Sequence, residues 1–159
     1  MVATRDKHRT IVSRHLASGE TLQALINVNS GSTGAGSNPG TRITNVDRYL
    51  ERNGIREKGI NGEFSVADIW LALTDQRMLV FSGSWFTLAP KPKKYLTDLP
   101  RAGVRVAWRD ERALRPCRLF HFVFPGDQHI VRLGEVDEEA DRFVAALGVQ
   151  ATPLPPEHP

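Results

Sequence analysis

The feature that most constrains the fold is a change in hydrophobic period near the C-terminal end of the chain. Between residues 66 and 133, apolar residues recur at every second position in several short segments, which is typical of strands with one buried face. Between residues 136 and 147 they recur at every third or fourth position, which predicts an amphipathic helix. Because that helix must bury its apolar stripe against the strands, this order predicts a mainly β domain closed by a C-terminal helix.

Seven strands and three helices are predicted from these periods and from the turn residues between them. The predicted strands are residues 22–28, 66–74, 77–82, 94–99, 104–109, 119–124 and 128–133. The predicted helices are residues 5–18, 45–53 and 137–147, and the last of them starts at the N-cap Asp137 and stops at Gly148. Asp75 and Gln76 form a tight turn, so residues 66–82 make a hairpin.

The domain organisation follows from the length of the chain and from two stretches of biased composition. A chain of 159 residues is long enough for one domain. Residues 1–19 are expected to form a helix packed on that domain, which spans residues 20–148. Residues 29–65 are interpreted as a flexible insertion, since the Gly/Ser-rich run 29–40 opens it. The Pro-rich residues 149–159 predict a disordered tail.

One hairpin carries a recognisable pattern, in which a Thr-Asp-Gln-Arg turn joins two apolar strands. It reads Leu71-Ala-Leu-Thr-Asp-Gln-Arg-Met-Leu-Val-Phe81. The Leu99-Pro100 step, the Phe-rich strand that ends in Pro125-Gly-Asp, and the helix 137–147 agree with it. Over residues 20–148 this order resembles the pleckstrin-homology-like (PH-like) superfold, in particular its small bacterial, GRAM-like branch. The resemblance implies a seven-stranded, partly open barrel or sandwich capped by one C-terminal helix, here with an extra N-terminal helix.

The same resemblance implies a binding domain, because PH-like domains bind inositol lipids, peptides or partner domains. Lipid-binding members carry basic residues at the end of the first strand and a Lys-x-Arg-like pair on the second. In this chain, residues 21–28 and 66–74 contain no Lys or Arg, and the second segment carries Asp68. The phosphoinositide site of the superfold is therefore not implied here.

Composition excludes several other classes of protein. The single cysteine, Cys117, allows neither an intrachain disulfide nor a four-cysteine zinc site. No stretch approaches the roughly 20 apolar residues of a membrane span, and no signal peptide is recognisable, so we expect a cytoplasmic protein. The net charge of +3 is uneven, with ten Lys or Arg against three acids in residues 77–118 and two against six in residues 119–148.

No constellation of residues predicts an enzyme, a cofactor or a metal. Cys117 and His121 lie on the same side of a predicted strand and could act as nucleophile and base, but no third group orients them. The Gly-rich run 31–36 lacks the Lys-Ser/Thr of a phosphate-binding loop. The acidic cluster of Glu138, Glu139 and Asp141 is expected to be a solvated helix face. A small enzyme built on Cys117 and His121 remains the least favoured hypothesis.

Two groups of residues are candidates for binding, and the first combines aromatic and basic side chains between two predicted strands. Its members are Trp85, Phe86, Lys91, Lys93 and Lys94. Rings enter the membrane interface and lysines attract anionic lipid, so this group suits an anionic membrane surface. Trp85 and Phe86 could instead end the strand and pack in the core, and this alternative stays open.

The second candidate group is a series of arginines in and after the predicted strand 104–109. Its members are Arg105, Arg109, Arg112, Arg115 and Arg118. Arg105 and Arg109 share a face if the strand is regular, and the other three lie in and after the next turn, so together they could form a basic stripe. Such a stripe suits nucleic acid, although Asp110 and Glu111 dilute its charge.

These observations favour a non-catalytic, PH-like binding module that recruits a protein or peptide partner. A second copy of the chain is one such partner, because the edges of an open sheet can accept a further strand. The alternative is a peripheral membrane module at the inner face of the membrane, acting through Trp85, Phe86 and the three lysines. Nucleic-acid binding through the arginines is the second alternative.

Overall fold

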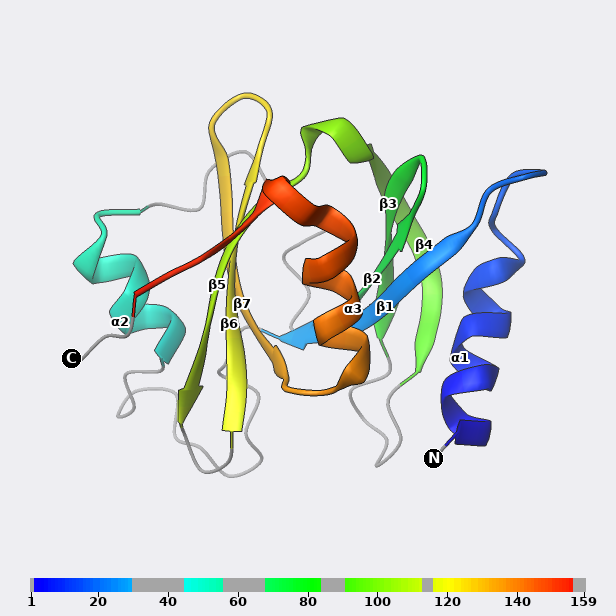
Figure 1. Cartoon of the computed structure of the whole chain (residues 1–159), viewed down its shortest axis with the longest axis horizontal. Coiled ribbons are helices and arrows are strands. Elements are labelled where there is room, and N and C mark those ends of the chain that lie inside the picture. The colour runs from blue at the N-terminus through cyan, green and yellow to red at the C-terminus, as the bar shows by residue number, and fades with distance from the viewer. Residues whose placement is uncertain (1, 30–44, 56–67, 84–90, 113–115, 156–159) are drawn as a thin grey trace.

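The computed structural model describes residues 2–29, 45–55, 68–83, 91–112 and 116–155 (Figure 1). Its helices are α1 (Val2–Ser13), α2 (Asn45–Arg52) and α3 (Glu138–Leu147). Its strands are β1 (Leu22–Asn29), β2 (Asp68–Thr74), β3 (Arg77–Gly83), β4 (Pro92–Pro100), β5 (Arg105–Arg112), β6 (Pro116–Phe124), β7 (Gln128–Glu135) and β8 (Ala151–Pro153). Two short 3-10 helices, η1 (Arg101–Gly103) and η2 (Gly148–Gln150), follow β4 and α3.

The strands form one sheet in the order β4-β3-β2-β1-β7-β6-β5-β8. All neighbours are antiparallel except β8, which runs parallel to β5. β1 meets β7 through the pairs Val28↔Gly134 and Asn29↔Leu133, so the sheet divides there into a β1–β4 half and a β5–β7 half (Figure 1). β4 and β8 form its two edges, and the predicted mainly β, partly open architecture is confirmed.

The core lies between the two halves of the sheet and beneath α3. The period-2 pattern buries Phe120 and Phe122 of β6, and their rings contact Phe143 of α3 edge-on, with centroids 6.0 and 6.1 Å apart. Asp137 caps α3, because its side chain accepts a hydrogen bond of 2.8 Å from the amide of Ala140. The predicted C-terminal helix over an open sheet is therefore confirmed.

The N-terminal helix α1 covers the outer face of the β1–β4 half. Val12 packs there with Trp70 and Phe81. Arg9 also ties α1 to α3, because its Nη1 lies 3.0 Å from both carboxylate oxygens of the buried Glu139. The same carboxylate accepts a hydrogen bond from the amide of Leu25 at 2.8 Å, so one side chain of α3 joins α1 and β1.

The helix α2 covers the outer face of the β5–β7 half, at the opposite end of the molecule from α1 (Figure 1). Val46 and Tyr49 of α2 pack there against Leu119 and Val131 of the sheet. This docking places one element of the predicted insertion 29–65 on the domain. The Gly/Ser-rich run that opens the insertion lies outside the described residues.

A buried ion pair fixes the turn that leads into β1. Arg77 binds Glu20 through two hydrogen bonds, Nε to Oε2 at 2.9 Å and Nη2 to Oε1 at 3.0 Å. Thr74 donates to the same carboxylate at 2.6 Å, and the side chain of Glu20 is fully buried. The hydrogen bonds from Arg77, with those from Thr74 and the Ala17 amide, lower the pKa of Glu20 to about 2.

Three sequence predictions need correction. The acidic cluster of α3 is not a solvated face throughout, because Glu139 is 6% exposed and binds Arg9. The first helix ends at Ser13 instead of residue 18, because the following residues turn so that the amide of Ala17 donates to Glu20 at 2.8 Å. The disordered tail predicted from residue 149 is wrong for Ala151–Pro153, which form β8. Proline is tolerated there because an edge strand pairs on one side alone. The amide of Leu154 then donates to the carbonyl of Trp108 at 2.7 Å.

Candidate functional site

The aromatic and basic group is only partly within the described residues. Trp85 and Phe86 lie outside them, so whether these rings are core or exposed stays a prediction. Lys91, Lys93 and Lys94 are exposed at the start of β4, which is an edge of the sheet. The structure therefore places the three lysines at one solvent-accessible edge.

The arginine group does not form one stripe. Arg105 and Arg112 are exposed, and Arg115 lies outside the described residues. Arg118 is buried, with Nε 2.7 Å from Asp110 and Nη1 2.9 Å from Asp141, and its guanidinium lies 4.5 Å from the ring centroid of Trp108.

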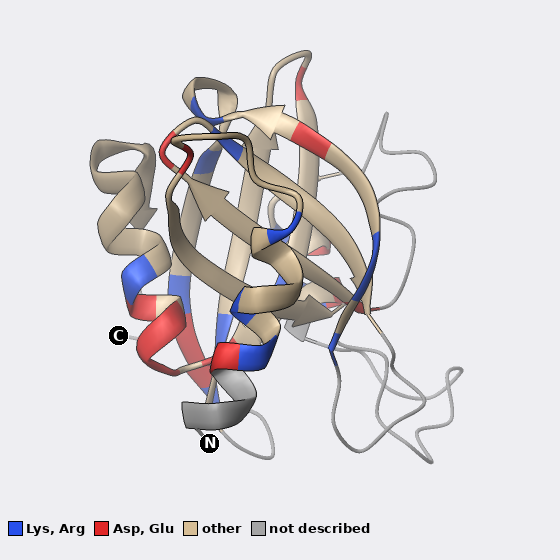
Figure 2. Ribbon diagram, turned by 90° about the vertical axis from the view of Figure 1, so that its right-hand side faces the viewer, with Lys and Arg blue, Asp and Glu red and all other residues tan. Residues whose placement is uncertain are grey.

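Arg109 is also paired, but on the opposite face of the sheet from Arg118. Its Nε lies 2.6 Å from Glu111 and its guanidinium 5.3 Å from the ring centroid of Tyr49 of α2. Acidic and basic residues lie close together along the helices as well (Figure 2). This interleaving does not favour the extended basic surface that nucleic acid would need.

Cys117 and His121 occupy the same face of β6 but are not paired as nucleophile and base. The thiol of Cys117 lies 3.7 Å from the carbonyl oxygen of Glu111. Both ring nitrogens of His121 are bonded elsewhere, Nδ1 to Tyr49 and Nε2 to His129. The geometry thus does not provide the arrangement on which the enzyme hypothesis depended.

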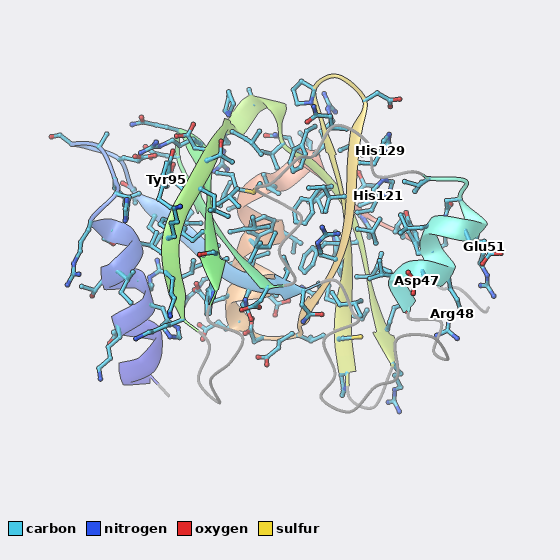
Figure 3. All side chains as sticks on the ribbon, turned by 180° about the vertical axis from the view of Figure 1, so that it is seen from behind. Asp47, Arg48, Glu51, Tyr95, His121 and His129 are labelled. Atoms are coloured by element: carbon cyan, nitrogen blue, oxygen red, sulfur yellow. The ribbon has the colours of Figure 1, made fainter. Side chains whose placement is uncertain are left out.

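A chain of four polar side chains from three parts of the sequence lies on the face of the sheet that carries α2. Tyr49 Oη lies 2.9 Å from His121 Nδ1, and His121 Nε2 lies 2.9 Å from His129 Nδ1. His129 Nε2 lies 2.9 Å from Asp127 Oδ1 in the turn between β6 and β7. Figure 3 shows the two histidines side by side on the face that carries α2.

The hydrogen bonds of this chain have one consistent direction when both imidazoles are neutral. An ionised carboxylate can only accept, so Nε2 of His129 donates to Asp127. His129 then accepts at Nδ1 from Nε2–H of His121, and His121 accepts at Nδ1 from the hydroxyl of Tyr49. Burial raises the pKa of Tyr49, although the charge of Arg109 opposes this effect. The raised pKa keeps the hydroxyl protonated, as this direction of the hydrogen bonds requires.

The outer edge of β5 is the second feature of this region, because the chain itself adds a strand to it. Val106, Ala107 and Trp108 pair in parallel with the three residues of β8. The side chain of Ala151 packs against the main core, and that of Leu154 packs in the cluster of α2. One short extended segment is therefore held at both ends by apolar contacts and between them by backbone pairing.

The start of β2 holds a buried carboxyl group with an unusual environment. Asp68 Oδ1 accepts a hydrogen bond of 2.7 Å from Asn27, whereas Oδ2 of Asp68 and Nε1 of Trp70 have no hydrogen-bond partner among the described residues. Burial raises the pKa of Asp68. Gly83 lies directly beneath this carboxyl, because a Cβ there would lie 2.1 Å from Oδ2.

Sequence reasoning missed the tyrosine–histidine chain and the added strand. His121 and His129 flank the predicted turn at Pro125–Asp127, so hairpin register could have placed them near each other. Tyr49 gave no such signal, because it lies 72 residues from His121 in an insertion.

No protein-family model matches the sequence, and no curated protein matches it. Within the described ranges, no helix is long and apolar enough to cross a membrane. The His, Cys, Asp and Glu side chains of the same ranges do not gather in threes as a metal site requires.

Proposed function

We propose that the chain is a non-catalytic binding module that recruits a protein or peptide partner by adding an extended segment to the edge of β5. The observation that carries this proposal is β8, since the chain's own C-terminal segment already pairs with that edge. Added strands gain affinity from backbone hydrogen bonds and specificity from pockets for alternate side chains. β8 has only three residues, and Thr152 and Pro153 are exposed, which suits a replaceable occupant.

The contacts of β8 indicate which segment this edge would accept. A small apolar residue fits where Ala151 packs against the core, and a larger one fits where Leu154 packs beside α2. The side chains of the two residues between them face solvent, so the edge does not restrict their type. The partner segment therefore has the pattern small-x-x-aliphatic and runs parallel to β5.

The other edge of the sheet is a poorer receptor. β4 carries two register irregularities against β3 and begins and ends with proline. Lys93 and Lys94 are exposed beside them. Bulges, prolines and lysines are the devices by which proteins block edge pairing, so we assign recruitment to β5.

The proposed relationship to the PH-like superfold is supported by the run of antiparallel strands β1 to β7 followed by α3. Domains of that kind commonly act by binding. A shared architecture does not by itself imply a shared function, and the edge of β5 is the feature that supports binding here.

The test weakens β8 in the intact chain and offers the same segment as a separate peptide. The tail acts at an effective concentration on the order of millimolar, so it outcompetes a micromolar peptide in the unaltered protein. We expect Leu154→Asp to bind a fluorescent peptide of residues 149–159 at least tenfold more tightly than the unaltered chain, measured by anisotropy.

The control variant is Val149→Asp, at a residue that is 97% exposed, and it should bind the peptide no better than the unaltered chain. A second control is the same peptide carrying Asp in place of Leu154. If the Leu154→Asp protein binds neither peptide, or binds both equally, the proposed edge site is wrong.

A membrane role is the second candidate, favoured by the exposure of Lys91, Lys93 and Lys94 at one edge. Each lysine near an anionic surface contributes about 1 kcal/mol, so the three support weak, reversible attachment at the inner face of the membrane. Co-sedimentation with anionic vesicles at low salt, lost at high salt and with neutral vesicles, would support it. Equal recovery of Lys93→Glu/Lys94→Glu with the anionic vesicles would refute it.

A further inference from the structure

We infer that Tyr49, His121, His129 and Asp127 form a proton-operated latch, which holds α2 on the sheet when both histidines are neutral and loosens it on acidification. Tyr49 is the only member that α2 contributes. The other three belong to β6, β7 and the turn between them. Within this chain of four side chains, α2 therefore takes part through one hydroxyl group.

The first added proton already disturbs this hold. Whichever imidazole takes it, Nδ1 of His121 becomes a donor and points its hydrogen at Tyr49. The hydroxyl of Tyr49 must then accept, and its own hydrogen loses the acceptor it had. Tyr49 is 6% exposed as a whole residue and its bond to His121 is part-buried, so the loss of this acceptor costs free energy in the docked state.

A second proton breaks the chain. With both imidazoles charged, Nε2 of His121 and Nδ1 of His129 are both donors, 2.9 Å apart. Two like charges then face each other without a shared hydrogen bond. Only the neutral chain lets Tyr49 donate to His121, so docking of α2 is favoured above the histidine range and weakens as the pH falls through it.

Among the described residues, four elements on this side of the sheet carry the other charged and titratable groups. They are Asp47, Arg48, Glu51 and Arg52 of α2, Arg105, Arg109 and Glu111 of β5, Cys117 of β6 and Glu135 of β7. The ion pair of Arg109 with Glu111 carries no net charge. Carboxyl groups ordinarily titrate near about 4, thiols near about 8.5 and guanidinium groups above about 12, so histidine is the side chain type that changes charge between these values.

Loosening of α2 has a consequence for β8, and this step rests on the proposed function. Leu154 follows β8 and packs in the cluster that contains Tyr49 and Val46 of α2. Figure 1 shows the C-terminal segment running along β5 toward α2. When α2 leaves, Leu154 loses its contacts with the α2 side of this cluster, so a partner segment displaces β8 from the edge of β5 more readily.

Hydrogen exchange of α2 backbone amides in the intact protein, corrected for intrinsic rates, tests the latch. If undocking takes up one proton, protection of α2 falls about tenfold per pH unit below the histidine range, near pH 6.5, while the β2 and β3 amides keep theirs. Tyr49→Phe keeps the ring and removes the hydroxyl, so it should abolish this slope. Tyr95→Phe is the matched control, because its hydroxyl binds Asp98 on the other half of the sheet (Figure 3).

A second variant, His129→Gln, keeps the inference testable if Tyr49→Phe folds poorly. It removes one imidazole at the end of the hairpin and should lessen the slope. A wild-type protein whose α2 protection does not change with pH, or an unchanged slope in both variants, would overturn the latch. Peptide binding by Leu154→Asp at neutral pH is read separately, so failure of the β5 site and failure of the latch give different results.

Discussion

The buried carboxylate of Glu20 provides the sharpest test of the physical account, by the substitution Glu20→Gln. The pKa of this group is about 2 in the folded chain, against an ordinary value of 4.5. A difference of this size corresponds to about 3 kcal/mol of folding free energy, since one pKa unit is about 1.4 kcal/mol. Because the folded pKa is lowered, this stability is present above pH 4.5 and is lost as the pH falls toward 2.

We expect Glu20→Gln to lower the free energy of unfolding by about 3 kcal/mol at pH 7, measured by urea denaturation. The difference between the wild type and the variant should shrink between pH 4.5 and 2, where the native carboxylate takes up its proton. The amide cannot reproduce the ion pair, because its nitrogen would face donors on Arg77 or Thr74.

The control is the same substitution at an exposed ion pair. Glu138 binds Arg142 at 2.7 Å with its side chain 61% exposed, and such surface pairs contribute about 0–1 kcal/mol. Equal losses for Glu138→Gln and Glu20→Gln, or a Glu20→Gln difference that stays constant from pH 7 to pH 3, would refute the reasoning.

Three further substitutions follow from the packing. Gly83→Ala should lower stability by about 1–3 kcal/mol, because its Cβ would lie 2.1 Å from Asp68 Oδ2, and an Asp68→Ala background should remove most of that loss in a denaturation cycle. Asp68→Asn should raise the melting temperature at pH 7, since burial raises the pKa of the acid and its ionised form destabilises the fold as the pH rises; an unchanged melting temperature contradicts this. Phe143→Ala should cost about 3–5 kcal/mol in chemical denaturation, whereas Val149→Ala, at a 97% exposed residue, should cost almost nothing.

Most of the fold could be predicted because its signals are local. Period-2 alternation places Phe120, Phe122 and Phe124 on the core face of β6, and the tight turn at Asp75 and Gln76 defines the β2–β3 hairpin. Asp137 and Gly148 bound α3 as predicted. Each of these features depends on residues a few positions apart, which is the range that backbone geometry and capping govern.

The arginines show where local reasoning stops. Spacing predicts which face of a strand a side chain occupies, but not whether an acid from a distant element meets it there. Arg118 forms an ion pair with Asp141 on α3, 23 residues away. The guanidinium of Arg109 lies over the ring of Tyr49. Their spacing predicts that both contribute to a basic surface, whereas both are paired within the fold.

A β domain with a C-terminal helix can be predicted from the sequence, because hydrophobic period and turn chemistry act over short distances. How the distant parts of the chain meet depends on the folded structure. It placed Tyr49 against His121, ordered the proline-containing β8 against β5, and set Leu154 beside α2. Such contacts depend on the packing of elements far apart in the chain, which no local pattern encodes. The proposed edge site and the proposed latch both depend on contacts of that kind.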